Sequence, residues 1–426
     1  MGLNDKKVIN GWAFFDWANS AYFLVISTAI FPAYFIARTS SEIEIFGYYI
    51  KNSTVYSYSV SFAYLIIVLL SPILSGIADY GGKRMFFLKF FTYLGSISCL
   101  LMFFFTGDLN VWIGVGAFVL ATMGAAGGLV FYDAYLPEIA SEDMIDKVSA
   151  KGYMFGYFGS VLLLIFILFM SIKPGFFGIP ENTTIPYRLG FALVGIWWMG
   201  FAQITFNRLP KGVNENMSYK MIRHGIEKIN DVIKKLFRNK NLSLYLISVF
   251  FFNAGVQTVL YLASVFAKEE LRFDTDELII IILIIQIIAI AGAYIFAYVS
   301  LKTGNKTGLA IMIIIWFLIA LTAYFVQSKS QFYILAGFVG LVLGGIQSQA
   351  RATYSKLVEN ETGEMTSFFS FFEIMLKLSI VIGTFSFGLV NELTGNLRYS
   401  VLSLAMYFVL GLIFLLISNF KLAKSL

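Results

Sequence analysis

The chain has 426 residues, of which 58% are hydrophobic and only 13% are charged, and its formal net charge is +6. Soluble domains average about 25% charged residues, so this composition excludes a soluble enzyme, a disordered chain and a nucleic-acid-binding protein. The single cysteine, Cys99, excludes a disulfide framework, and the single histidine, His224, excludes the common histidine metal sites. We therefore expect an all-α membrane protein without a metal or another cofactor.

Twelve apolar runs follow one another along the chain, and each approaches the roughly 20 residues that a helix needs to cross a bilayer. The first six occupy residues 12–37, 55–78, 86–105, 111–131, 152–172 and 187–206. The second six occupy residues 242–266, 278–299, 309–326, 332–350, 367–390 and 399–417. This pattern predicts twelve transmembrane helices in two pseudo-symmetric six-helix bundles, residues 12–207 and 242–418. Residues 1–11 and 419–426 are expected to be short cytoplasmic tails.

The connection between the two halves, residues 208–241, is long and rich in Lys and Arg. Five apolar residues recur in it at intervals of four and three: Ile222, Ile226, Ile229, Ile233 and Leu236. This spacing places them on one face of a helix, with basic residues on much of the remaining surface. We expect an amphipathic helix that lies on the inner membrane surface and is held there by apolar burial and anionic lipid.

Basic residues are distributed unevenly between the two sides of the predicted bundles. With the N-terminus inside, 21 of the 31 Lys and Arg residues fall on cytoplasmic segments and eight fall on outer loops. Cytoplasmic loops of membrane proteins carry such an excess, so both termini are expected in the cytoplasm. We expect a monomeric multi-pass protein of the cell's inner membrane whose partners are the bilayer and a small solute.

A charged, glycine-containing motif follows the second apolar run, at residues 75–84. Its small and charged members are Gly76, Ala78, Asp79, Gly82, Lys83 and Arg84. The segment resembles the signature that the major facilitator superfamily carries between its second and third helices, although Ser75 and Tyr80 replace a glycine and an arginine. A carboxylate at a helix end can accept hydrogen bonds from the N-terminus of a neighbouring helix. We expect Asp79 to hold the inner ends of the second and eleventh helices together and so to stabilise an outward-open state.

A weaker copy of the motif follows the eighth apolar run, where a six-plus-six repeat would place it. There Gly304 matches Gly82, and Lys306 matches Arg84. Leu301 takes the position of the acidic residue, so this copy lacks the carboxylate. The pairing supports an internal duplication.

A closer resemblance covers most of the chain. It rests on residues 12–22, 30–35, 131–138, 151–159, 255–259, 344–347 and 367–373, together with Lys377. These stretches resemble one facilitator family, the fungal autophagy-related vacuolar amino-acid effluxers and their bacterial relatives. The resemblance implies transport, and for the fungal members it implies amino-acid efflux. This sequence departs from the family pattern at Ala254, where the family tends to have Asp, and at residues 349–352, where only Arg351 of an expected Ser-Arg-Ser remains.

Polar side chains inside the apolar runs mark the expected transport site. In a facilitator fold, the first, fourth, seventh and tenth helices line a central cavity, and here they contain Asp16, Asn19, Asp133, Asn253, Gln257, Thr258 and Gln347. A charge inside the bilayer costs several kcal/mol, so it normally faces a cavity or a partner. Glu373 and Lys377 lie four residues apart, in the order that favours an intrahelical ion pair. They are expected either to neutralise each other or to take part in coupling.

Two charged residues receive specific expectations. Asp16 is the expected proton carrier, because burial shifts a carboxyl group towards protonation near neutral pH. Arg351 could bind an anionic substrate or anchor the tenth helix at the inner membrane surface, and the anchor is the favoured interpretation.

These observations predict a secondary active transporter that moves a small polar solute by alternating access, with amino-acid efflux and proton coupling as its specific form. A passive channel and a non-transporting membrane receptor remain as alternatives on the same fold. A membrane enzyme is excluded, because no nucleophile–histidine–acid set can be assembled from one linker histidine.

Overall fold

The computed structural model describes residues 2–45, 47–181, 183–212, 230–273, 275–359 and 363–419. Twelve helices in these ranges are long and apolar enough to cross a membrane. The predicted number of transmembrane helices is therefore confirmed.

The first six transmembrane helices form one bundle. The first of them is continuous from Lys6 to Arg38 and consists of α1 (Lys6–Ala21), a π-helical segment η1 (Tyr22–Ile30) and α2 (Phe31–Arg38). The others are α3 (Asn52–Gly81), α4 (Arg84–Met102), α5 (Val111–Asp133), α7 (Glu142–Ile172) and α8 (Ile185–Arg208). Short connecting elements are η2 (Asp108–Asn110), α6 (Leu136–Ile139) and η3 (Pro174–Phe177).

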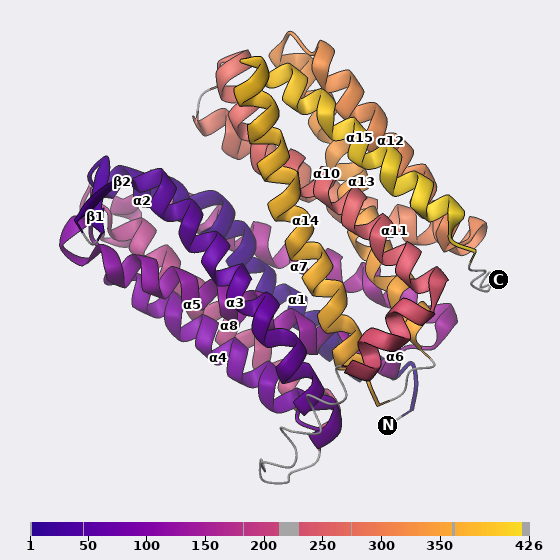
Figure 1. Ribbon diagram of the computed structural model, residues 1–426. Coiled ribbons are helices and arrows are strands. Elements are labelled where there is room, and N and C mark those ends of the chain that lie inside the picture. The colour runs from indigo at the N-terminus through magenta and orange to yellow at the C-terminus, as the bar shows by residue number, and fades with distance from the viewer. Residues whose placement is uncertain are drawn as a thin grey trace.

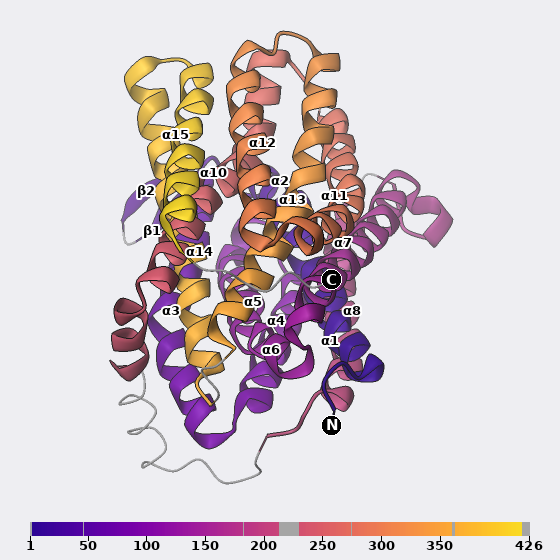
Figure 2. The same ribbon diagram turned by 90° about the vertical axis from the view of Figure 1, so that its right-hand side faces the viewer.

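The second bundle contains the remaining six transmembrane helices. They are α10 (Lys240–Leu271), α11 (Thr275–Thr303), α12 (Asn305–Phe325), α13 (Lys329–Val358), α14 (Met365–Thr394) and α15 (Leu397–Ile417). Figure 1 shows the two bundles side by side, one coloured indigo to magenta and the other pink to yellow, and in Figure 2 they overlap in the view. Each bundle is built around its own large apolar core.

The two bundles approach each other at one end of the molecule and diverge at the other (Figure 1). We call the first end the termini side, because the N-terminal residues, the α3–α4 turn and the end of α15 lie there. We call the opposite end the hairpin side, after a two-stranded β-hairpin that connects α2 to α3.

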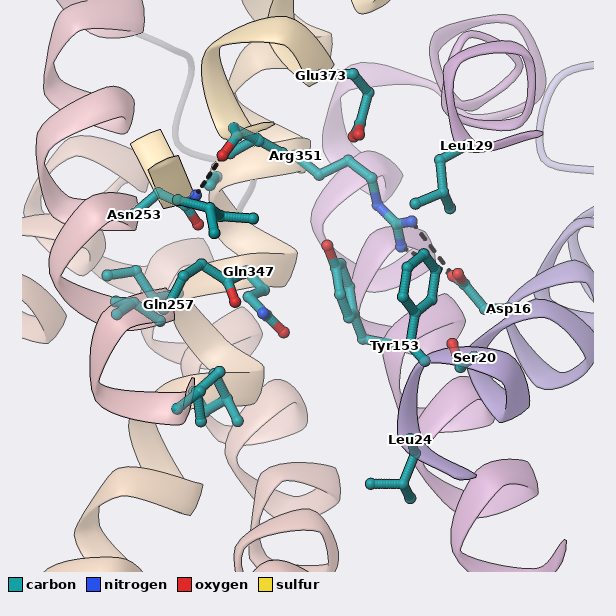
Figure 3. Close-up of a pocket in the computed structure, with 18 of the residues that line it drawn as sticks. Asp16, Ser20, Leu24, Leu129, Tyr153, Asn253, Gln257, Gln347, Arg351 and Glu373 are labelled. Carbon is teal, nitrogen blue, oxygen red and sulfur yellow. Dashed lines mark hydrogen bonds and ion pairs between the residues drawn. The ribbon is translucent and has the colours of Figure 1, made fainter. Parts of the chain in front are cut away.

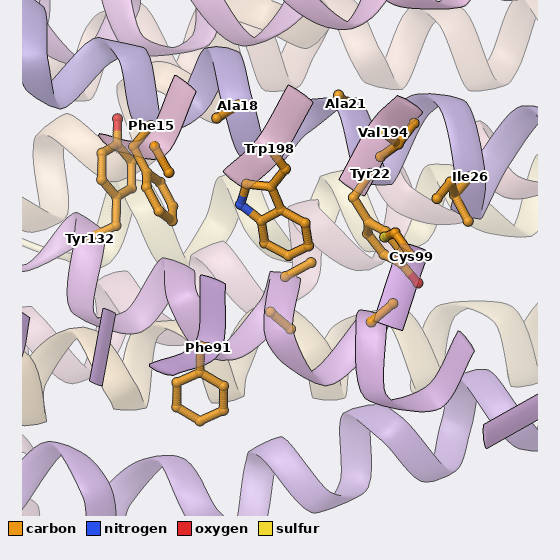
Figure 4. Packing of buried hydrophobic residues seen from close by; sticks show 14 of the residues in the cluster. Phe15, Ala18, Ala21, Tyr22, Ile26, Phe91, Cys99, Tyr132, Val194 and Trp198 are labelled. Atoms are coloured by element: carbon orange, nitrogen blue, oxygen red, sulfur yellow. The ribbon is translucent and has the colours of Figure 1, made fainter. Parts of the chain in front are cut away.

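Aromatic and small residues fit together in the core of the first bundle (Figure 4). Trp198 of α8 is fully buried, and a Cβ atom at Gly95 of α4 would lie only 2.2 Å from its indole ring. Trp12 of α1 stacks on Tyr132 of α5 with ring centroids 4.5 Å apart, and its indole donates a hydrogen bond to the Tyr132 carbonyl. This packing fixes α1 against α5, and both helices carry acidic residues of the expected site.

The β-hairpin was not predicted from the apolar runs. Strands β1 (Glu42–Ile45) and β2 (Tyr48–Lys51) pair antiparallel, with Ile43 opposite Ile50. Gly47 between them has a φ of +84°, a conformation that glycine adopts without steric cost. The alternation of Glu and Ile in β1 is a strand signal, but it is too short for a search based on helix-length runs.

The predicted linker helix lies mostly outside the described residues, including Ile222, Ile226 and Ile229. Residues 230–238 are helical. Val232 and Leu236 pack into the apolar core of the second bundle, and Lys235 pairs with Glu364 at 2.6 Å. The described end of the linker therefore packs on the second bundle through Val232 and Leu236.

The repeated turn is visible in the backbone. Gly82 between α3 and α4 has a φ of +60°, and Gly304 between α11 and α12 has a φ of +90°. Both positions therefore require a conformation that glycine adopts readily. The two matched glycines therefore share a positive φ in the turns between their helices.

Candidate functional site

A cavity of about 260 Å³ lies between the two bundles. Eight of the nine predicted substrate-site residues line it: Asp16, Asn19, Asp133, Asn253, Gln257, Gln347, Glu373 and Lys377. Figure 3 shows Asp16 and Ser20 of the first bundle on one side, with Gln257 and Gln347 of the second bundle on the other. The structure thus brings side chains from five transmembrane helices into one polar space.

Thr258 corrects the predicted set. Its side chain is fully buried and does not line the cavity. Instead it faces α14, where a Cβ atom at Gly383 would lie 2.3 Å from the threonine hydroxyl. Successive residues on a helix point about 100° apart, and here Gln257 faces the cavity whereas Thr258 faces α14.

The first transmembrane helix widens beside the cavity. The π-helical segment η1 carries four lining residues, Phe23, Leu24, Ser27 and Thr28. The Thr28 hydroxyl donates a 2.8 Å hydrogen bond to the Phe23 carbonyl, five residues earlier. Such segments inside α-helices often occur at functional sites, and sequence reasoning missed this one.

Arg351 of α13 is the central charged residue of the site (Figure 3). Its Nη1 lies 3.2 Å from Asp16 Oδ2 and 3.0 Å from Asp133 Oδ1, so one nitrogen serves both carboxylates. Its Nη2 donates to Asp16 Oδ2 at 3.2 Å and to the Ser149 carbonyl at 2.9 Å. One guanidinium from the second bundle therefore contacts α1, α5 and α7 of the first.

Aromatic rings enclose this guanidinium. Its central carbon lies 4.3 Å from the ring centroid of Tyr153 and 4.7 Å from that of Trp12. Cation–π contacts of this kind gain strength when water is excluded, and only 2% of Arg351 is exposed. The Tyr132 hydroxyl adds a 2.8 Å hydrogen bond to Asp16 Oδ2.

The buried ion pairs of Arg351 show that the predicted inner-surface anchor was wrong. Helix α13 continues seven residues beyond it, to Val358, so Arg351 lies within the helix and not at its end. The predicted run stopped at Ala350 because polar residues follow it. The small residues on both sides of the arginine, Ala350 and Ala352, are the feature of the sequence that could have indicated close packing there.

Glu373 and Lys377 form the predicted ion pair on α14. Lys377 Nζ lies 3.1 Å from Glu373 Oε2, and both side chains are at most 10% exposed. The ammonium group also lies 5.4 Å from the ring centroid of Tyr64 on α3. The pair therefore sits at the boundary between the bundles and faces the cavity.

Amide side chains supply the uncharged polar lining. The Tyr157 hydroxyl donates a 2.6 Å hydrogen bond to Gln347 Oε1, which connects α7 to α13. Asn253 uses its amide nitrogen to hold α14, with a 2.7 Å hydrogen bond to the Ser379 hydroxyl. In contrast, Asn19 Oδ1 and Gln286 Oε1 are buried and accept no hydrogen bond from the described residues. Gln286 of α11 was not predicted, because α11 was not among the helices expected to line the cavity.

The α3–α4 motif closes the termini side. The Asp79 carboxylate accepts hydrogen bonds from the backbone N–H groups of Thr366 and Ser367, at 3.1 and 2.8 Å, and from the Ser367 hydroxyl at 2.8 Å. These groups belong to the first turn of α14, the eleventh transmembrane helix. The contact expected between the second and eleventh helices is therefore present.

Other members of the motif support this contact. Arg84 donates from Nε to the Thr366 hydroxyl at 2.8 Å and pairs with Glu138 of α6, also at 2.8 Å. Gly82 shapes the turn, Lys83 occupies the N-cap position of α4, and Gly76 is buried one turn before Asp79.

A second polar cluster on the termini side was not predicted. Lys356 of α13 pairs with Asp146 of α7 at 2.7 Å and donates to Asn305 Oδ1 at 3.0 Å. The Asn305 amide in turn donates to Asp146 Oδ1 at 2.6 Å. The side chains of Lys356 and Asp146 are each only 1% exposed. The three residues of this cluster lie far apart in the sequence, in separate polar stretches. Nothing in the sequence indicates that these stretches come together.

The inter-bundle hydrogen bonds and ion pairs described above lie at the level of Tyr157 and Gln347 or nearer the termini side. The cavity lining extends from there towards Thr28 and Ile380, in the direction of the hairpin side. The molecule is therefore sealed at the termini side of its cavity.

Two bundles of six helices around a central polar cavity define a transporter of the major facilitator superfamily. Solved structures share this fold. The chain matches FucP, a transporter of this superfamily in the outward conformation, with a TM-score of 0.70 and 15% identity over 97% of this chain and 99% of that one. It matches the proton:xylose symporter XylE with a TM-score of 0.67 and 15% identity over 97% and 94% of the two chains.

The chain belongs to the family described as "Vacuole effluxer Atg22 like", whose model matches residues 4–425. Among its relatives is an uncharacterized MFS-type transporter of Bacillus subtilis (strain 168), YxiO, which is 28% identical over 411 residues, or 96% of this chain and 94% of the relative. Autophagy-related protein 22 of Pichia angusta is 25% identical over 421 residues, or 84% of this chain and 74% of that protein.

Proposed function

We propose that this protein is a secondary active transporter that moves a small zwitterionic solute by alternating access, coupled to protons. The observation that carries the proposal is a polar cavity between two pseudo-symmetric bundles, sealed at one end by contacts that each join one bundle to the other. Such contacts can break together when the bundles rock around a central site.

The lining suits a zwitterion because it offers both signs of charge. Carboxylates of Asp16 and Glu373 can meet an ammonium group, and Lys377 can meet a carboxylate. Asn19 Oδ1 and Gln286 Oε1 are buried acceptors available to ligand donors. Buried polar atoms without a protein partner commonly bind ligand or water.

The size and apolar lining suit a solute of the amino-acid class. The cavity volume of about 260 Å³ is near the lower end of ligand pockets. Its remaining lining includes aromatic and aliphatic residues that can receive an apolar side chain, among them Phe23, Leu129 and Phe372. Efflux is the direction suggested by the family description, and amino acids are the substrates that the resemblance implies for the fungal members.

The test is solute counterflow in proteoliposomes that contain the purified protein. Vesicles are loaded with individual unlabelled amino acids, and entry of the same labelled amino acid is followed. An alternating site exchanges solutes, so we expect trans-stimulated uptake of at least one amino acid. Uptake without trans-stimulation would support a channel, and no uptake of any amino acid would contradict the proposed substrate class.

Once a transported amino acid has been found, its KM for counterflow tests whether it binds in this cavity. Gln257→Ala should raise the KM for counterflow several-fold, because an amide that faces the cavity is lost while the inter-bundle contacts remain. Gln203→Ala is the matched control, since Gln203 of α8 bonds to Tyr93 and lies outside the cavity lining. An unchanged KM in Gln257→Ala would place the binding site elsewhere.

A further inference from the structure

The five charged side chains that line the cavity do not balance one another. Asp16, Asp133 and Glu373 contribute three carboxylates, whereas Arg351 and Lys377 contribute two cations. All five residues are at most 8% exposed. A net negative charge held away from water is costly, so such a site takes up a cation or a proton.

The excess charge lies with two carboxylates that share one cation. Glu373 and Lys377 form a one-to-one ion pair. In contrast, a single nitrogen of Arg351 contacts both Asp16 and Asp133, which holds the two carboxylates close together. Two carboxylates in one buried site cannot both ionise easily, and such a pair retains one proton.

Hydrogen bonding distinguishes these two carboxylates. Asp16 Oδ2 accepts three hydrogen bonds, one from the Tyr132 hydroxyl and two from Arg351. Asp133 accepts one, at Oδ1, and its Oδ2 accepts none from the described residues. Donors stabilise the ionised form of a carboxylate, so the geometry favours placing a proton on Asp133, which accepts fewer hydrogen bonds. Asp133 lines the cavity, where water can deliver a proton.

We propose that the cavity binds one proton on Asp133 Oδ2, and that this proton neutralises the cluster of Asp16, Arg351 and Asp133. The inference rests on the proposed transport function and refines it, since a zwitterion adds no net charge and leaves the proton in place. The O–H bond forms with a proton taken from cavity water, and the proton returns to water when the cavity opens to the termini side. Asp133 thus replaces Asp16 as the proton carrier.

A proton fits this cluster better than a metal ion. Besides Arg351 of α13 and Asp16 of α1, the ionisable groups near Asp133 are Glu373 of α14 and the hydroxyls of Tyr132 of α5 and Tyr153 of α7. The part of the chain that the structure describes holds no group of three or more His, Cys, Asp or Glu side chains able to bind a metal.

The test is infrared difference spectroscopy of the purified protein in lipid, titrated across neutral pH without any solute. We expect the carbonyl band of one protonated carboxylic acid, shifted when aspartate is labelled with carbon-13 at its side-chain carboxyl group. In Asp133→Glu the band should lose this isotope shift, because the proton then sits on an unlabelled glutamate. In the matched Asp16→Glu variant it should keep the shift, and in Asp133→Asn the band should be absent.

Three results would overturn the assignment. An isotope-shifted band that persists in Asp133→Glu would place the proton on another aspartate. Absence of a titrating acid band from the folded wild type would show that no proton neutralises the cluster. A band present in choline chloride and abolished by sodium chloride would assign the neutralising cation to sodium. Because no solute is used, these results bear on proton coupling and leave the proposed exchange of a zwitterion by alternating access intact. Conversely, counterflow can fail while the band remains.

Discussion

Gly152 shows how a missing side chain allows the charged cluster to form. A Cβ atom at this position would lie 2.4 Å from Asp16 Oδ2 and 2.8 Å from Arg351 Nη2. Gly156, one turn further along α7, has a similar role beside Ser20, whose hydroxyl would lie 2.5 Å from an added Cβ atom. Helix α7 can therefore approach α1 closely enough for one guanidinium to reach three helices of the first bundle.

Gly152→Ala should destabilise the protein by disturbing these contacts. Overpacking a close contact typically costs about 1–3 kcal/mol, so we expect a lower Tm in thermal unfolding of the purified protein. Gly200→Ala on α8 is the matched control, because nothing lies within 4 Å of an added Cβ atom there. It should leave the Tm unchanged or raise it, since alanine favours helix over glycine by about 1 kcal/mol. Equal losses in both variants would argue against close packing at Gly152.

At the scale of single residues, the sequence was informative where polarity interrupted an apolar run. Asp16, Asn19 and Gln257 stood out for that reason, and the structure places all three at the cavity. Arg351 was misread because it follows the last apolar residue of its run, and only the tertiary structure shows that it is buried in ion pairs between the bundles. Which face of a helix meets the cavity depends on packing. Thr258 illustrates this, because its side chain points to α14 and not into the cavity.

The contact between α3 and α14 is a charge–dipole interaction between two elements. The Asp79 carboxylate bonds to two backbone N–H groups in the first turn of α14, where the helix has its partial positive charge. These two donors are backbone groups, so they remain when a side chain of α14 is changed. The carboxylate on α3 is therefore the component of the contact that mutation can remove.

Asp79→Asn should weaken the seal on the termini side. Losing a contact of this type costs about 0.3–2 kcal/mol, which shifts a two-state population several-fold. Spin labels at Phe86 of α4 and Lys240 of α10, in a Cys99→Ser background, should then report longer distances by double electron–electron resonance. Both positions are exposed on the termini side.

Leu301→Ala provides the control for this prediction, because Leu301 holds the corresponding position of the repeat without a carboxylate. It should leave the distance distribution close to that of the wild type. The seal assigned to Asp79 would be wrong if both variants lengthened the distances equally.

At the scale of elements, all twelve transmembrane helices followed from apolar length alone. Features that depend on contacts between distant segments did not follow. The cluster of Asp146, Asn305 and Lys356 joins three helices whose polar residues are unremarkable in sequence. The short helix α6 has only four residues, too few to show a helical period in the sequence.

The orientation of the whole molecule in the membrane is a prediction from its basic residues. Single cysteines at Gln327 and Lys147, introduced in a Cys99→Ser background, would test it, because both positions are exposed at opposite ends of the bundles. With the termini inside, Gln327→Cys should react with an impermeant maleimide on intact cells. Lys147→Cys should react only after permeabilisation. The reverse pattern would place the termini outside.

The hydrogen bond between Tyr157 and Gln347 joins the two bundles directly at the cavity lining. A solute that takes the Gln347 oxygen as its acceptor must compete with the tyrosine that joins the two bundles there. Binding of the solute and separation of the bundles would then both depend on the Gln347 oxygen. For anyone who redesigns this protein, selectivity and turnover rate could not be tuned separately at this position: each gain in affinity would alter how fast the bundles part.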